Sequence, residues 1–403
     1  MMLAAASFSS GLFASPVLFG LMCWPFLVVW VLWASRRPEP DQASFMARLG
    51  LGLSGLALLG CSSGMTWGQE VCLAMEACVP ALLFVLRGRT EPITGTASFR
   101  EGMSVYLPFL VTGCVFMGLL LRPPLAALFF DGAGTVLLAW WDGRATRRAM
   151  PAWEVARLRL SGLILAGLGF AVMQGGGVFS SSESAAQVGQ VLALTGLCMM
   201  AGLGSAVSSR AELVLLDAGL RFVPLFLMAL LAVIPFMRHL MVVAGLLALA
   251  GTFLGRQGSF PLLSWMTGLG VLAAGTGQMP CLLLLYGGAL LATALRLGCD
   301  GLLLGGVAAL PVQMVLPVIM IVLAVMAPLL GWPALLGLLA CVMLGFRHLE
   351  LETMPQGVLA VWQRGGWVMR GLLLLLVLLV LLAVALLVWG GMLVPPLPDL
   401  KGH

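Results

Sequence analysis

Long apolar segments, separated by short polar connections, run along the whole chain. An α-helix needs about 20 apolar residues to cross the hydrocarbon core of a bilayer, and a lipid-embedded segment must satisfy its own backbone groups. The pattern therefore predicts an all-α polytopic membrane protein, a single transmembrane domain over residues 1–403 with about fourteen helices. The predicted ranges are 12–35, 49–66, 67–86, 103–121, 124–141, 160–174, 186–208, 212–236, 240–255, 259–276, 278–295, 301–325, 326–346 and 371–394.

The distribution of arginine orients these helices. The chain has a single lysine, Lys401, among 21 basic residues. With strict alternation of spans, most arginines fall in connections on one side, while Arg122 and Arg238 fall on the other. The positive-inside rule then predicts a multi-pass protein of a bacterial-type inner (plasma) membrane, with both termini non-cytoplasmic.

The amino-acid composition limits the classes of partner that this chain can have. Hydrophobic residues make up 61% of the chain, charged residues 9%, and the mean hydropathy is +1.09, which excludes a soluble domain. No basic, aromatic-interleaved stretch indicates nucleic acid. The lipid bilayer is the expected partner, and we expect no cofactor, no metal site and no catalytic constellation.

Few charged residues fall inside the apolar ranges, and each of these is a candidate for function. Asp131 lies about a third of the way into the fifth span, either as an ion-path carboxylate or as a helix cap after the Arg122-Pro-Pro break. Glu76 lies deep in the third span without an obvious local partner, so a neighbouring arginine or another subunit could satisfy it. Asp217 and Arg221 are four residues apart, which permits a helical ion pair.

Two further features concern the helix ends and a polar strip. Prolines inside apolar segments predict kinked or broken helices, which either mark ion paths or are ordinary kinks. Residues 347–370 form either a cytoplasmic loop anchored by tryptophans or an amphipathic strip that docks a neighbouring subunit. The prolines concerned are Pro224, Pro235, Pro311, Pro317 and Pro328.

Several segments, taken in order, resemble the antiporter-like subunits of respiratory complex I, energy-converting nickel–iron hydrogenases and Mrp-type antiporters. FFDGAGTVL places Asp131 at the glutamate of the family's fifth span. The segment Ala-Trp-Glu-Val has Glu154 where the family has lysine, which makes Glu154 a further ion-path candidate. The glycine-rich end of the seventh span has Ala206 at the lysine position.

The later segments resemble the same family. The family's "GxPPxxGF" segment corresponds to the stretch that contains Pro328, Gly331 and Trp332, and the eleventh-span segment LLLYGGALLATALRLG has no histidine or lysine left. The resemblance covers roughly residues 100–350, which we take as the antiporter-like core. It implies fourteen core spans, external termini and a row of protonatable groups at the bilayer midplane.

This chain keeps one carboxylate of that row and has lost its lysines. Arginine cannot take their place, because it does not release its proton at working pH. One hypothesis is therefore a divergent membrane subunit of a proton- or ion-translocating oxidoreductase complex, degenerate in its own ion path and structural or coupling in role, with redox centres in other subunits. The alternative is an active transporter of protons or cations that uses Asp131 and Glu76.

Overall fold

The computed structural model describes most of the chain, with gaps at the ends and at several connections. The described residues are 16–35, 40–61, 67–87, 99–146, 149–174, 183–203, 211–232, 234–254, 261–301, 312–330, 332–348 and 366–393. Within these ranges the regular elements are helices, and no β-strand is formed. The all-α class expected from the sequence is confirmed.

Every one of the fourteen apolar ranges contains helix in the described residues. The first range is divided at Cys23, after which a new helix begins at Trp24; Pro25, its second residue, has no backbone N–H to donate to the preceding turn. The helices of the first half are α2 (Pro16–Met22), α3 (Trp24–Ala34), α4 (Pro40–Cys61), α5 (Trp67–Arg87), α6 (Phe99–Leu120), α7 (Pro124–Thr146) and α8 (Ala149–Gln174). Those of the second half are α9 (Glu183–Met200), α10 (Ala211–Leu231), α11 (Pro235–Leu254), α12 (Pro261–Gly275), α13 (Met279–Gly301), α14 (Val312–Met326), the 3₁₀ turn η1 (Ala327–Leu329), α15 (Trp332–His348) and α17 (Trp367–Leu393).

The predicted prolines have different effects. Pro224 and Pro317 lie inside α10 and α14, and Pro235 is the first residue of α11. Pro328 lies in η1, between the end of α14 and the start of α15, so the helix break predicted at this proline is confirmed. Pro311 lies outside the described residues.

Within the described residues, seven helices are long and apolar enough to cross a membrane, and shorter apolar helices accompany them. Their outward faces carry large apolar side chains, such as Leu59, Ile164 and Leu247, which are mostly exposed. A surface of this kind suits hydrocarbon and not water. Together with the fold comparison below, these helices make the chain a multi-pass membrane protein.

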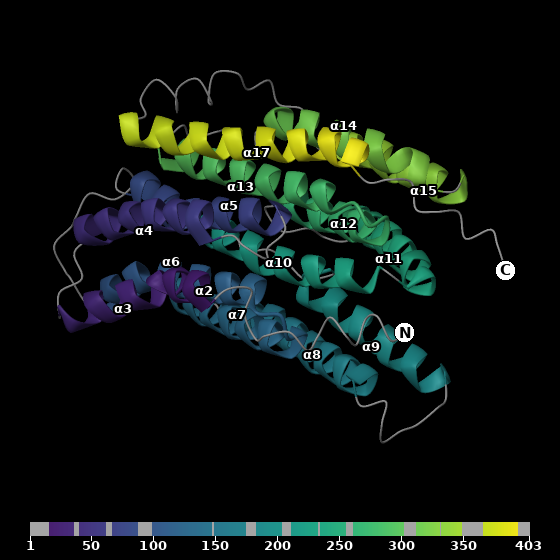
Figure 1. The fold of residues 1–403 in the computed structure, drawn as a ribbon, viewed down its shortest axis with the longest axis horizontal. Coiled ribbons are helices and arrows are strands. Elements are labelled where there is room, and N and C mark those ends of the chain that lie inside the picture. Colours follow the sequence, from purple (N-terminus) through teal and green to yellow (C-terminus); the bar gives the residue numbers. More distant parts are fainter. Residues whose placement is uncertain are drawn as a thin grey trace.

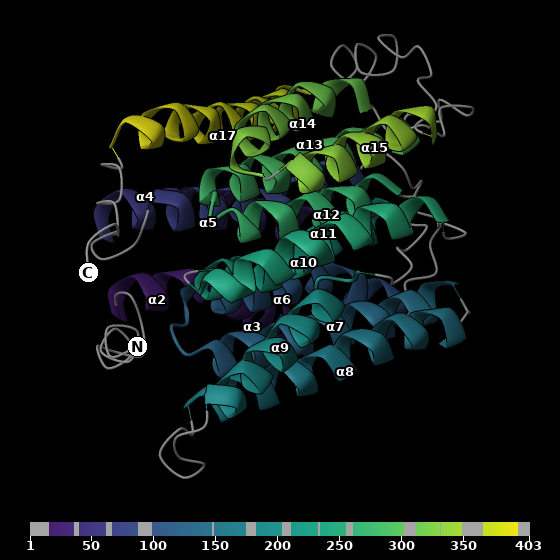
Figure 2. The same cartoon turned by 90° about the vertical axis from the view of Figure 1, so that its right-hand side faces the viewer.

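The helices lie roughly side by side in a bundle (Figure 1). In both views α17 and α14 lie along one edge and α8 and α9 along the opposite edge (Figures 1 and 2). Helix α10 is central, because it packs against α5, α6, α7, α9, α12 and α13. Polar side chains that face inward from α10 are therefore shielded from both lipid and water.

The tightest helix pair is α8 with α9, and glycines make it possible. A Cβ added at Gly196 would lie 2.2 Å from the Ala166 nitrogen and 2.5 Å from the Gly162 oxygen. A Cβ added at Gly169 would lie 2.3 Å from the Ala193 nitrogen. Small residues allow backbones to approach this closely, as in other membrane helix pairs. The contact fixes the end of α9 beside the middle of α8.

Candidate functional site

Four charged side chains are buried together between three helices. Asp131 comes from α7, Arg159 from α8, and Asp217 and Arg221 from α10. Asp131 is 0% exposed and Arg159 is 2% exposed. Ionisable groups at such depth in a membrane bundle are costly and are a functional hypothesis by default.

Asp217 is the hub of this group, which we call the charge cluster. Its Oδ1 accepts a hydrogen bond from Arg159 Nη1 at 2.6 Å, and its Oδ2 accepts one from Arg221 Nε at 2.6 Å. The predicted pair between Asp217 and Arg221 is thus confirmed. The second arginine on the same carboxylate was not predicted, and it links α8 to α10.

Both arginines also bind the end of α9. Arg159 Nε donates to the Met200 carbonyl oxygen at 2.8 Å, and Arg221 Nη1 donates to the Gly202 carbonyl oxygen at 3.3 Å. Gly202, two residues after the last residue of α9, has φ 78°, a left-handed conformation that glycine adopts without strain. The last carbonyls of a helix carry partial negative charge, so two guanidinium groups are favourable beside them.

Asp131 lies within the uninterrupted helix α7, so the alternative that it caps a helix is wrong. It has electrostatic interactions with Arg159 and Asp217. Neither of its carboxylate oxygens has a hydrogen-bond partner among the described residues, and the same holds for Arg159 Nη2. The cluster therefore contains a carboxyl group and a guanidinium group that interact electrostatically without a direct hydrogen bond.

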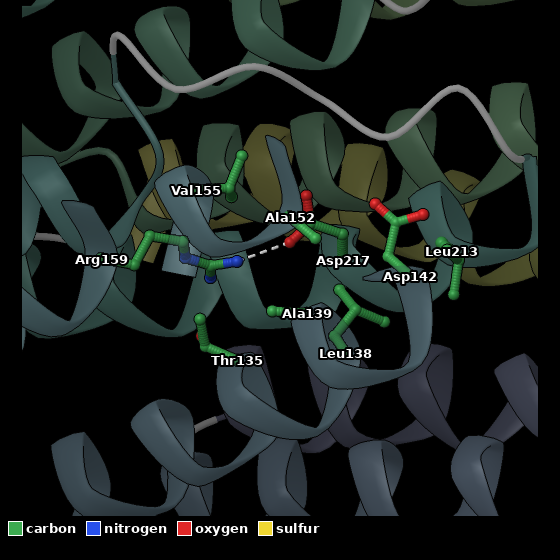
Figure 3. A pocket seen from close by; sticks show the side chains of 9 residues that line it. All are labelled: Thr135, Leu138, Ala139, Asp142, Ala152, Val155, Arg159, Leu213 and Asp217. Carbon is green, nitrogen blue, oxygen red and sulfur yellow. Dashed lines mark hydrogen bonds and ion pairs between the residues drawn. The ribbon is translucent and has the colours of Figure 1, made fainter. Parts of the chain in front are cut away.

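A cavity of about 40 Å³ lies next to the cluster, which is room for a few water molecules. Figure 3 shows the Arg159 guanidinium pointing toward Asp217, with Thr135 below Arg159 in this view; all three residues line the cavity. Asp142 lines the same cavity from the end of α7. Because Asp131, Thr135, Leu138 and Asp142 follow helical spacing, they share one face of α7.

Glu76 occupies a separate buried position, in α5, and is 1% exposed. Its Oε1 accepts a hydrogen bond from Thr112 Oγ1 of α6 at 3.0 Å, and its Oε2 accepts one from the Tyr286 hydroxyl of α13. Gly219 of α10 leaves room for the carboxyl, because a Cβ there would lie 2.8 Å from Oε2. Two hydroxyl groups thus take the role for which we had considered an arginine or another subunit.

The other predicted positions are not brought to either site. Glu154 is exposed on α8, and Pro328 is exposed in η1. Trp332 begins α15 and is also exposed. Ala206 and Gly331 lie outside the described residues, as does most of the 347–370 strip.

Sequence reasoning missed three residues of these sites. The predicted sixth span, 160–174, leaves Arg159 in the preceding connection, but this residue belongs to α8 and is buried. A signal was present, since Ala152, Ala156 and Arg159 follow helical spacing and all three are buried. Thr112 and Tyr286 carried no such signal, because they lie 36 and 210 residues from Glu76 in the chain.

The bundle, its broken helices and its buried ion pairs define a class, the polytopic helical membrane proteins with charged groups inside the bundle. Among solved structures, the fold is similar to a chain of respiratory complex I from Thermus thermophilus, determined with bound aureothin. The TM-score is 0.58, and the match covers 93% of this chain and 98% of that chain at 17% identity. No protein-family model and no curated protein matches the sequence. The likeness confirms the resemblance to complex I at the level of the fold, and the roles of residues rest on this chain's own geometry.

Proposed function

We propose that this protein is an antiporter-like membrane subunit of a larger complex I-type or hydrogenase-type oxidoreductase assembly, with a structural or coupling role. Its fold extends over nearly the whole of a complex I chain, which supports a similar place in an assembly. The redox centres would belong to other subunits. The arginine bias of the connections favours a bacterial-type inner membrane with both termini on the non-cytoplasmic side.

The charge cluster is the observation that carries the structural or coupling role. At the end of α9 the resemblance implies a lysine, a group that can release a proton when it is desolvated. Here the positive charge near that helix end comes from Arg159 and Arg221, which remain protonated. Both are also bound to Asp217 at 2.6 Å, so neither side chain is free to carry a proton onward.

Such a cluster can still couple helices mechanically. It joins α8, the end of α9 and α10 through four charge-assisted hydrogen bonds. A displacement of any of the three helices would separate charges in a low-dielectric interior, which is costly. The three helices should therefore move together, as one rigid part of the larger assembly.

Affinity purification from native membranes in mild detergent tests this proposal. The tagged full-length chain should retain stoichiometric partners that include redox-active subunits of an oxidoreductase. An equally hydrophobic tagged protein from the same membrane serves as the control for carry-over. Recovery of the chain alone, from membranes in which it is natively expressed, would rule out the subunit role.

Asp131 supports a second candidate function, active transport of protons or cations. Its carboxylate oxygens have no hydrogen-bond partner in the described residues, and its face of α7 leads along the cavity to Asp142. A buried acid one helical turn from Thr135, which lines a cavity that can hold water, could take up and release a proton. Glu76 would act with it in this candidate. Ion flux through the purified protein distinguishes the two functions.

A further inference from the structure

The Glu76 site is built differently from the charge cluster, although both are buried in the same bundle. No arginine or lysine side chain is bonded to Glu76 within the described part of the chain; its two partners are the hydroxyls of Thr112 and Tyr286. The described charged neighbours on α10, Asp217 and Arg221, are paired with each other, and Asp217 also binds Arg159 of α8. On α10 it is Gly219, between them, that faces Glu76.

The remaining surroundings are apolar or weakly polar. The titratable groups in electrostatic contact with the carboxyl are Cys72 and Cys78 of α5 and Tyr286 of α13. The Phe222 ring packs on the Tyr286 ring at 5.1 Å. From α17, Val380 fills the space beside Gly287, next to Met75 of α5. None of these groups supplies a positive charge.

An ionised carboxylate in this place would lack a counter-charge. Burial of an isolated charge without a partner is far more costly than burial of a hydrogen-bonded neutral group. The same two hydrogen-bond partners also suit a neutral acid. Threonine can accept as well as donate, so a proton on Oε1 can be donated to Thr112 Oγ1 while the Tyr286 hydroxyl donates to Oε2.

We infer that Glu76 is a resident proton-binding site, a neutral carboxylic acid that joins α5, α6 and α13 by hydrogen bonds to Thr112 and Tyr286. This site is separate from the charge cluster, and it does not depend on the proposed role in an assembly. In it, the proton replaces the counter-ion that the cluster obtains from arginine. The hydrogen-bonded acid holds together helices from both halves of the chain.

Infrared difference spectroscopy of the purified full-length protein tests the inference. At neutral pH the spectrum of the wild type minus that of Glu76→Gln should contain the carbonyl stretch of a protonated carboxylic acid, which moves to lower frequency in D₂O. Glutamine has the same shape and can pair with both hydroxyls, so the variant should fold. Glu154→Gln, at an exposed position, should leave the band unchanged. A difference spectrum that holds only carboxylate bands would overturn the inference.

A second measurement keeps the inference testable if Glu76→Gln does not fold. With ¹³C-labelled glutamate, the protonated-acid band should shift, because it belongs to a glutamate. In Tyr286→Phe the same band should move to higher frequency, since its carbonyl oxygen loses a donor. A band that does not respond to the label, or that is unchanged in Tyr286→Phe, would contradict the assignment.

Discussion

Removal of Asp217 from the charge cluster should be the most damaging single neutralisation in the protein. Asp217→Asn leaves Arg159 and Arg221 buried beside each other without the carboxylate that holds both at 2.6 Å. Loss of one partner of a buried ion pair costs about 3–5 kcal/mol, because the remaining charge is uncompensated. Here two charges are left, so we expect the upper part of that range.

Arg159→Met should cost less. Asp217 keeps Arg221, and the loss is confined to the bonds that Arg159 makes to Asp217 and to the Met200 carbonyl. A hydrogen bond to a charged group contributes about 1.5–3 kcal/mol, but this variant leaves no charge unpaired, and the neutral methionine side chain retains part of the packing. Arg157→Met is the matched control, since Arg157 is exposed on the same helix and its replacement should change stability by about 0.5 kcal/mol or less.

The double variant tests whether the charges of Asp217 and Arg159 depend on each other. Arg159→Met in the Asp217→Asn background removes one of the two uncompensated arginines, so it should cost much less there than alone. Unfolding in detergent micelles gives the four free energies of a double-mutant cycle, and we expect a coupling of about 1–3 kcal/mol. Additivity to within about 0.5 kcal/mol would refute the reasoning that these charges depend on one another.

Two other predictions concern the packing that positions the site. Gly196→Ala should lower the free energy of unfolding by about 1–3 kcal/mol, because its Cβ would lie 2.2 Å from the Ala166 nitrogen. Gly167→Ala is the control and should be tolerated, since the nearest neighbour of its Cβ would be 3.8 Å away. Equal melting temperatures of the two variants in detergent would contradict the close contact between α8 and α9. Ser54→Ala should cost about 1–3 kcal/mol, because the buried Trp24 Nε1 loses its 2.8 Å hydrogen bond to Ser54, and a free energy of unfolding unchanged from the wild type would argue against that bond.

The helices could be predicted from the sequence because each apolar run carries its own signal. The pair of Asp217 and Arg221 was likewise local, since a spacing of four residues places both on one helix face. Arg159 was misassigned for a physical reason: the positive-inside rule counts arginines near span ends and does not distinguish one that turns inward. The first half of α8 was therefore assigned to a connection between helices.

The hydrogen-bond partners of Glu76, in contrast, could not be predicted from the sequence. The sequence marked the carboxyl as buried and unpartnered, which was enough to select it. Its partners come from α6 and α13, and only the tertiary packing around α10 brings them to it. Contacts between distant segments leave no periodic trace in a single sequence, so a charged partner and a hydroxyl partner could not be told apart.

Proton flux through the purified protein in liposomes tests the central claim, that the charge cluster is fixed and does not relay protons. With a pH gradient and a fluorescent pH indicator inside, the wild type should dissipate the gradient no faster than protein-free liposomes, and Asp131→Asn should behave as the wild type does. An ionophore added at the end confirms that the vesicles are sealed. Wild-type flux well above the protein-free rate, abolished in Asp131→Asn, would contradict the account and establish active transport instead.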